Sequence, residues 1–521
     1  MKKYYLLILS TFLLISSFVF AVIGYSQTDD FAFYAYSTTI VTDWDPSIES
    51  SDGIIILPNI YETLLKYDPL EDKFIKVLAT DYTTSSDGLT WTFHLRKGVK
   101  FHDGTELNAD AVKFSIDRTI EMNMGTAFIW ASVDKINVID EYTVEFKLKY
   151  PAPLDLICSS GYAAYIMSPT AVKSHPDGWL TEGHEAGSGP YQLERYQQEQ
   201  GEIILTWFED YWGGWEGNHF QKVVIKDVSE AVTRQLLIEK GEVDATINLA
   251  YEGIASLQNN KNVKVLVDPS YQNLLLFFNV QKEPLNNKLV RQALSYAFPY
   301  QDVITYCLEG YGRQARGPVP YGLWGHSEEL FQYNYDLDKA KQLLEEAGYA
   351  NGGFSLLLTY CSGDEAERTT VELFKSKLAE LNIDLEIRGM PWDSQWALAK
   401  GNNVDKRQDI FVMYQWPDVC GPSCWIYNLF YSEEEPLWGL SYYQNKEFES
   451  LVDEALKESG VDRDKAIETY FKAQEILIED APAIYAYDLN RLYFLNKTFQ
   501  GFKDNPAYPS VIFFYDTYRE K

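Results

Sequence analysis

Residues 86–118, SDGLTWTFHLRKGVKFHDGTELNADAVKFSIDR, decide how the rest of the sequence is interpreted. From Leu89 to Leu95 apolar and polar residues alternate, which predicts a strand with one buried face. Asp-Gly and Lys-Gly pairs flank this segment and indicate turns, because glycine adopts positive φ without steric cost. Asn108 is a suitable N-cap for a helix whose apolar residues recur every four positions from Val112. The stretch therefore predicts a strand, two turns and a helix.

The same stretch, from DGLTWTFHLRKGVKFHDG to the helix that begins AVKFSIDR, resembles the signature of the family 5 extracellular solute-binding proteins. These are the binding components of bacterial ABC importers for peptides, nickel and some oligosaccharides. The resemblance implies an α/β fold of the periplasmic-binding protein type II (cluster C), with two lobes around a cleft and an extra third domain. It also implies that the lobes close over a solute and deliver it to an ABC permease with its ATPase subunits.

The chain has 521 residues, enough for two or three domains. Strand and helix patterns alternate in the second half of the sequence, which favours α/β lobes. We expect two separate strands, 264–267 and 274–280, where the chain crosses between the lobes. With the family resemblance, the expected units are domain I (27–60, 186–268 and 490–521), domain II (61–185) and domain III (269–489).

Charge and the N-terminal segment constrain the location and the partners. The formal net charge of −31 argues against nucleic acid and against anionic membrane surfaces. Residues 1–26 begin with lysines, continue with an uncharged apolar run and include a small-residue site at Ala21, which predicts a cleavable signal peptide. The run is also long enough to span a bilayer, so an uncleaved anchor is the alternative. No cysteine stands directly after the run, so we expect an exported, periplasmic or extracellular monomer without a lipid anchor.

The cysteines and histidines point to no metal and no catalysis. There are five cysteines, and Cys420 and Cys424 could form a disulfide across the short Gly-Pro-Ser loop. A metal site at this pair is disfavoured, because no histidine lies near it in sequence. His94 and His102 belong to the signature, and we expect structural roles for them. No nucleophile elbow, HExxH or phosphate loop is present, so we expect neither enzyme activity nor a cofactor; a secreted hydrolase is the alternative class.

We place the ligand at the segment Tyr414-Gln415-Trp416-Pro417-Asp418, which follows a predicted strand. The resemblance implies that this strand end offers main-chain groups to an extended peptide, and that an aspartate after the tryptophan binds the ligand's ammonium group. Here one residue, rather than the two of the peptide-binding members, separates the tryptophan from Asp418. The alternative interpretation of Asp418 is a solvated loop residue.

Aromatic residues offer a second kind of ligand recognition. Several of the 13 tryptophans lie in segments that we assign to the cleft, and their ring faces could stack on sugars. An oligosaccharide is therefore the alternative to an oligopeptide, and ordinary packing is the alternative for any single tryptophan. The further candidate ligand-binding residues are Trp44, Trp392, Trp396 and Trp425, with Tyr271 and Asn273 on the crossing strand.

Overall fold

The structure, a computed structural model, describes residues 31–37, 41 and 43–520. The expected signal peptide, residues 1–26, lies outside the described residues. Within the described part of the chain, no helix is long and apolar enough to cross a membrane.

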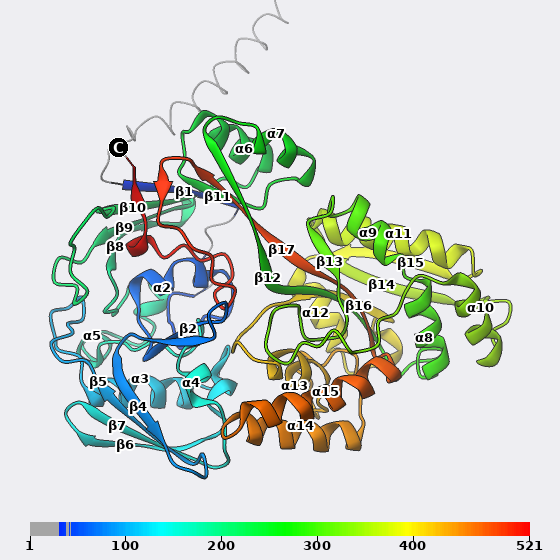
Figure 1. The fold of residues 1–521 in the computed structure, drawn as a ribbon, viewed down its shortest axis with the longest axis horizontal. Helices are drawn as coiled ribbons and strands as arrows, with labels where there is room; N and C mark the ends of the chain where they lie inside the picture. Colours follow the sequence, from blue (N-terminus) through cyan, green and yellow to red (C-terminus); the bar gives the residue numbers. More distant parts are fainter. Residues whose placement is uncertain (1–30, 38–40, 42, 521) are drawn as a thin grey trace, which may run out of the picture.

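One large sheet runs through the molecule (Figure 1). It has 11 strands in the order β15-β14-β16-β12-β17-β11-β1-β10-β9-β8, and β13 also pairs with β17. Its strands are β1 (Phe31–Tyr36), β8 (Tyr191–Gln197), β9 (Glu202–Trp207), β10 (Lys222–Asp227), β11 (Ala245–Ile247), β12 (Val263–Phe278), β13 (Gly312–Gln314), β14 (Ser355–Cys361), β15 (Asp384–Met390), β16 (Ile410–Gln415) and β17 (Ala483–Asn496).

Both halves of this sheet contain parallel strand pairs with helices in the connections. β1 pairs in parallel with β10 and β11, and β14 pairs in parallel with β15 and β16. Parallel neighbours need a crossover, which a helix commonly supplies. The helices that lie between such strands in the chain are α6 (Ala231–Lys240), α11 (Glu365–Ala379) and α12 (Trp392–Ala399).

The long strands β12 and β17 join the two halves of the sheet and cross the middle of the molecule (Figure 1). They pair antiparallel from Val263 opposite Asn496 to Phe277 opposite Ala483. The expectation of two separate strands, 264–267 and 274–280, was wrong, because pairing with β17 continues on both sides of a register shift between Pro269 and Asn273. The expected limits of domain III, after residue 268 and at residue 489, fall inside these two strands, and the three-domain division remains a prediction.

The opening stretch of the sequence forms the elements that it predicts. β5 (Thr90–Leu95) buries Trp91, Phe93 and Leu95, and α3 (Ala109–Met122) starts after Asn108, whose side chain accepts a 3.1 Å hydrogen bond from the Ala111 amide. β5 belongs to a four-stranded sheet in the order β4-β5-β7-β6. Its other strands are β4 (Ala79–Thr84), β6 (Val133–Asp140) and β7 (Thr143–Leu148). This sheet and α3 enclose a hydrophobic core of their own, which includes Trp130 and Phe146.

Short elements and further helices complete the fold. Two small antiparallel sheets each have two strands: β2 (Leu65–Asp68) with β3 (Lys73–Lys76), and β18 (Phe499–Gln500) with β19 (Tyr518–Arg519). The remaining α-helices are α2 (Leu57–Ile60), α4 (Leu154–Ile157), α5 (Pro169–Lys173), α7 (Ile254–Gln258), α8 (Lys288–Ala297), α9 (Tyr300–Tyr306), α10 (Leu337–Glu346), α13 (Ser423–Phe430), α14 (Lys446–Ser459) and α15 (Arg463–Asp480).

An ion pair ties helix α3 to the Asp-Pro loop near the N-terminus. The Arg118 guanidinium donates from Nη1 to Asp45 Oδ1 at 2.8 Å and to Ser47 Oγ at 2.7 Å, and its Nη2 donates to Asp45 Oδ2. The Asp45 side chain is only 3% exposed. Removing one partner of such a pair leaves a buried charge uncompensated, which is costly.

We therefore expect Arg118→Ala to destabilise the protein by about 3 kcal/mol, measured by chemical denaturation. Arg368→Ala is the matched control, because Arg368 pairs with Glu365 and Glu372 at the surface and its loss should change little. Equal effects of the two substitutions would contradict the role of the Arg118 ion pair.

Candidate ligand-binding site

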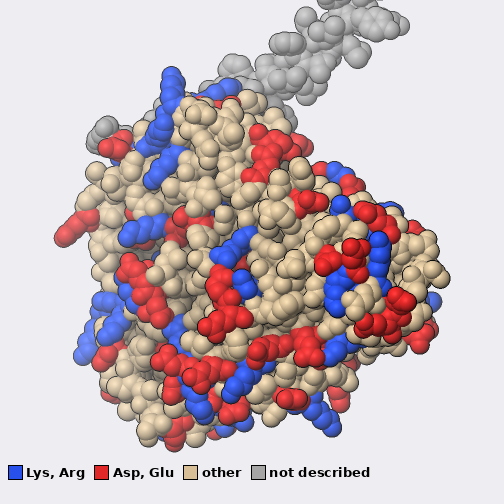
Figure 2. Space-filling model, turned by 45° about the vertical axis from the view of Figure 1, so that its right-hand side comes forward, with Lys and Arg blue, Asp and Glu red and all other residues tan. Residues whose placement is uncertain are grey.

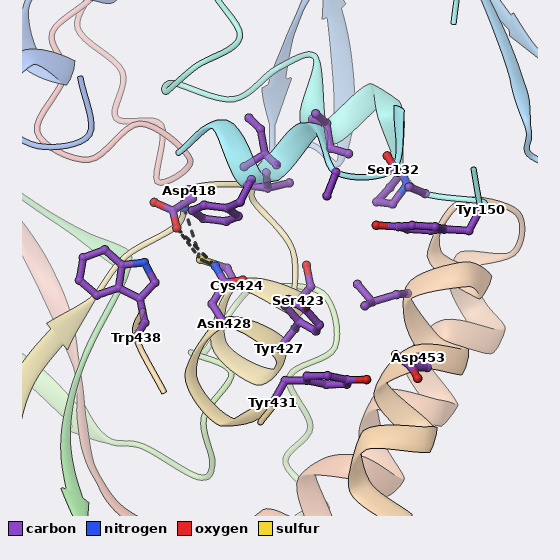
Figure 3. Close-up of a pocket in the computed structure, with 18 of the residues that line it drawn as sticks. Ser132, Tyr150, Asp418, Ser423, Cys424, Tyr427, Asn428, Tyr431, Trp438 and Asp453 are labelled. Atoms are coloured by element: carbon purple, nitrogen blue, oxygen red, sulfur yellow. Dashed lines mark hydrogen bonds between the residues drawn. The ribbon is translucent and has the colours of Figure 1, made fainter. Parts of the chain in front are cut away.

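A cavity of about 440 Å³ lies between two distant parts of the chain. Residues from Phe128 to Ile157 form one wall, and residues from Asp418 to Lys457, on α13, α14 and the segments that flank α13, form the other (Figure 3). The volume is within the range of small-molecule sites, and the lining includes apolar, aromatic and charged side chains. The cavity can therefore hold an organic solute with both polar and apolar groups.

Asp418 lines this cavity with few partners for its carboxylate (Figure 3). Oδ2 accepts a long 3.4 Å hydrogen bond from Asn428 Nδ2 and a 3.9 Å contact from the Cys424 thiol. No ion pair among the described residues includes Asp418. Its backbone is held firmly, since Ser160 Oγ donates to the Asp418 carbonyl oxygen at 2.6 Å.

This environment is unfavourable for the charged form of Asp418. Burial raises the pKa of its carboxyl from the ordinary value of 3.8 to about 7, and the bonds from Cys424 and Asn428 only partly oppose the shift. The Asp418 side chain is partly buried, and without a cation only its two weak bonds replace the solvation that it loses. A positively charged ligand group in the cavity would supply the missing partner.

Most of the other predicted ligand residues do not line this cavity. Tyr414 bonds through its hydroxyl to the Tyr487 hydroxyl at 2.9 Å, and Gln415 Nε2 donates to the Trp416 carbonyl oxygen at 2.9 Å. Pro417 is buried and Trp416 is half-buried. Of the predicted segment, only Asp418 reaches the cavity.

The predicted tryptophans Trp44, Trp392 and Trp396 do not line this cavity and lie against other aromatic rings, although Trp392 is 36% exposed. Trp44 is 1% exposed and its ring lies 4.9 Å from that of Tyr196. Trp392 and Trp396 contact Trp438, with ring centroids 6.4 Å and 6.1 Å away, and Trp438 itself lines the cavity. These two residues therefore form a layer behind the cavity wall.

The remaining candidates, Tyr271, Asn273 and Trp425, form hydrogen bonds that hold neighbouring loops in place. Asn273 Nδ2 donates to the Pro318 carbonyl oxygen at 2.7 Å, and its Oδ1 accepts from Trp425 Nε1 at 3.0 Å. The Tyr271 hydroxyl donates to the Gly322 carbonyl oxygen at 3.0 Å. Tyr271 lines a separate cavity of about 370 Å³, in which Arg463 also lies.

The disulfide between Cys420 and Cys424 is not formed, and this corrects the expectation from the sequence. Both thiols are buried and free. The Cys424 sulfur is turned towards Gln415 Nε2, at 3.1 Å, and the Asp418 amide, at 3.3 Å. Since Cys424 lies in the first turn of α13, that helix directs its side chain towards Asp418 and the cavity, whose lining does not include Cys420.

The histidines of the signature have local partners. His102 Nδ1 lies 2.8 Å from Glu185 Oε2, and its Nε2 lies 2.9 Å from the Gly189 carbonyl oxygen. His94 Nδ1 lies 3.3 Å from the Thr143 hydroxyl oxygen. In the described part of the chain, no group of three His, Cys, Asp or Glu side chains could hold a metal ion.

Sequence reasoning missed several cavity residues on helix α13 and nearby. Cys424, Tyr427, Asn428 and Tyr431 recur at spacings of three and four, so they lie on one face of the helix and just beyond its end. That spacing is a detectable signal, but it does not tell whether the face meets a cavity or the protein core. Tyr150 and Trp438 gave no local signal.

Comparisons with known proteins identify the family of the chain. Residues 73–436 match the family described as "Bacterial extracellular solute-binding proteins, family 5 Middle". The chain belongs to this family. Its members are the solute-binding components of ABC importers, so the protein binds a solute and is not an enzyme.

Individual relatives support the same assignment. The chain is 30% identical over 479 residues to the "Probable D,D-dipeptide-binding periplasmic protein DdpA" of Escherichia coli, covering 90% of each chain. It is 29% identical over 435 residues to the "Glutathione-binding protein GsiB" of Escherichia coli, covering 82% of this chain and 83% of the relative. The ABC transporter-associated periplasmic binding protein DppA from Helicobacter pylori, solved with the peptide STSA, superposes with a TM-score of 0.82 at 25% identity, covering 94% of this chain and 98% of that chain. The α/β fold of cluster C binding proteins is thereby confirmed.

The raised pKa of Asp418 makes a prediction for the ligand-free protein. The folded state binds the Asp418 proton more tightly than the unfolded state, so ionisation of Asp418 destabilises the fold as the pH rises from about 4 to 7. Asp418→Asn removes this effect. The stability of the variant relative to the native protein should therefore increase by about 1–3 kcal/mol between pH 4 and pH 8, measured by denaturant unfolding at each pH.

Asp134→Asn, at an exposed position on β6, is the control for loss of one negative charge. Its stability relative to the native protein should be nearly the same at both pH values. If the difference in stability between Asp418→Asn and the native protein does not change with pH, the Asp418 carboxyl is not held in its neutral form.

Proposed function

We propose that this protein captures an oligopeptide in the cavity beside α13, with the peptide's ammonium group bound to Asp418. The observation that carries the proposal is a cavity-lining carboxylate without a cationic partner among the described residues. An ammonium group donates up to three hydrogen bonds and carries the opposite charge. Its binding would replace the solvation that Asp418 has lost.

The energy of such a contact is large enough to select ligands. Hydrogen bonds between charged groups contribute about 1.5–3 kcal/mol net. Burial strengthens the interaction, because water cannot compete for the same lone pairs. A solute without a positive charge would leave the Asp418 carboxylate without a cationic partner.

The named ligands of relatives support a peptide. DdpA is named for D,D-dipeptides, GsiB for glutathione, and the DppA structure contains the peptide STSA. Each of these ligands is a peptide. The dipeptide-binding relative covers 90% of this chain, so the resemblance extends over the whole solute-binding architecture.

An oligosaccharide is the second candidate, because aromatic rings line the cavity. Tyr427, Tyr431 and Trp438 offer faces on which a sugar could stack. A neutral sugar would not supply a positive charge to Asp418, so we prefer the peptide.

The proposal includes export and delivery. We infer that residues 1–26 direct secretion and that the loaded protein docks on an ABC permease whose ATPase subunits lie on the other side of the membrane. A ligand can favour the closed state only through contacts with both walls of the cavity. The space-filling view shows acidic side chains mixed with Lys and Arg and no continuous basic surface on that face, which fits a solute-binding role rather than nucleic acid binding (Figure 2).

Asp418→Ala should weaken peptide binding by about 2–5 kcal/mol, the effect of leaving a buried charge without its partner. Isothermal titration calorimetry with a peptide library fraction or a defined tripeptide measures this. N-acetylation of the same peptide, which removes its positive charge, should weaken binding to the native protein by a similar amount.

Asp134→Ala is the control variant, and its peptide affinity should equal that of the native protein. The proposal is wrong if Asp418→Ala binds the free peptide as tightly as the native protein does and acetylation weakens binding to both proteins equally. A sugar ligand would instead be indicated by sugar binding that survives Asp418→Ala and is lost in Trp438→Ala.

A further inference from the structure

The end of the cavity remote from Asp418 combines aromatic rings with a carboxylate (Figure 3). Tyr150 comes from one wall, whereas Tyr427 and Tyr431 belong to the α13 segment of the other wall. The ring centroids of Tyr427 and Tyr431 are 4.7 Å apart. Asp453 on α14 lies at the same end of the cavity as Tyr150 and Tyr431.

The charges around this end favour a cation. Among the lining residues, Glu433 and Asp453 are acidic and Lys457 is basic, and Asp418 is a further acidic residue at the other end. Helix α14 forms ion pairs with Lys465 through Glu454 and Glu458. Asp453 takes part in none of the ion pairs among the described residues, and its carboxylate interacts with the Tyr431 side chain, so no ion pair neutralises its charge.

The Asp453 charge affects the pKa of the hydroxyls of two of these tyrosines. Burial and the neighbouring Asp453 carboxylate together raise the pKa of Tyr431 to about 12. The same two causes raise the pKa of Tyr150. The rings and the carboxylate therefore lie close enough to act on one group, at an end of the cavity where Asp453 and Tyr150 are exposed to solvent.

We propose that Tyr150, Tyr427, Tyr431 and Asp453 form a subsite for a positively charged side chain, so that the preferred solute is a peptide with lysine or arginine. Aromatic faces attract cations through their quadrupole, and a carboxylate adds a charge-assisted hydrogen bond. The subsite rests on the proposed peptide function and extends it. In this arrangement the far end of the cavity binds a side chain of the peptide, and Asp418 binds the peptide's ammonium group.

The test compares matched tripeptides by calorimetry. Alanine tripeptides carry either lysine or norleucine at the second or the third position, so that the two side chains differ in charge but hardly in length. The native protein should bind one of the lysine peptides about tenfold more tightly than its norleucine counterpart. Asp453→Asn should abolish most of this preference and leave the affinity for the norleucine peptide unchanged.

Glu454→Gln is the matched control, because Glu454 neighbours Asp453 on α14 but does not line the cavity. It should keep the preference for lysine. Equal affinities of the native protein for lysine and norleucine peptides would overturn the subsite while leaving peptide capture intact. A lysine preference that persists in Asp453→Asn would overturn the assignment of the subsite to these residues. If no peptide of the series binds, both the subsite and the proposed function are wrong.

Discussion

The antiparallel pairing of β12 with β17 is the constraint on which the arrangement of the molecule depends. These two strands unite the parts of the sheet that lie on either side of them. β16, which leads into Asp418, pairs directly with β12, so the position of the carboxylate is fixed by the same ladder. The register shift between Pro269 and Asn273 interrupts that ladder, and irregular strands bend more easily than regular ones. Motion of one half against the other is therefore expected to be concentrated there.

Bonds between segments far apart in sequence explain how further contacts from a solute could stabilise one arrangement of these halves. The Ser160 hydroxyl bonds to the Asp418 carbonyl oxygen. Beside the separate cavity that Tyr271 lines, the Arg463 guanidinium bonds to Asp72 Oδ1 at 2.7 Å and to the Tyr67 hydroxyl at 2.9 Å. Each of these bonds joins segments far apart in sequence. A solute held by Asp418 at one end and by Tyr150 at the other would add contacts of the same kind. The carboxylate that is unfavourable without a ligand would then become a source of affinity, as is common for strained or poorly solvated groups at binding sites.

Local sequence patterns predicted the parts of the fold that depend on neighbours in the chain. The alternation around Trp91 and the cap at Asn108 are short-range signals, and both gave the correct element. The continuity of β12 was not predictable, because it depends on pairing with a strand more than 200 residues away. Asp418 was predicted as a ligand residue through the family resemblance and remains a prediction, whereas its place in the cavity lining and the lack of an ion pair could be seen only in the folded chain.

The cavity residues show a similar limit. Trp44 and Trp396 have the residue type that binds sugars, yet the fold packs one against Tyr196 and the other against Trp438. Tyr427 and Asn428 have no distinctive motif, and they line the cavity because α13 turns that face towards it. Which side of a helix meets a cavity is decided by the elements packed around it. A sequence pattern gives the spacing of such residues but not the direction in which they point.

The most direct test of the central claim is a crystal structure of the protein with a bound peptide. The account predicts that the peptide's ammonium nitrogen lies about 3 Å from a carboxylate oxygen of Asp418, the distance of a charge-assisted hydrogen bond. A peptide whose amino terminus lies elsewhere, with Asp418 still in contact only with Cys424 and Asn428, would contradict it.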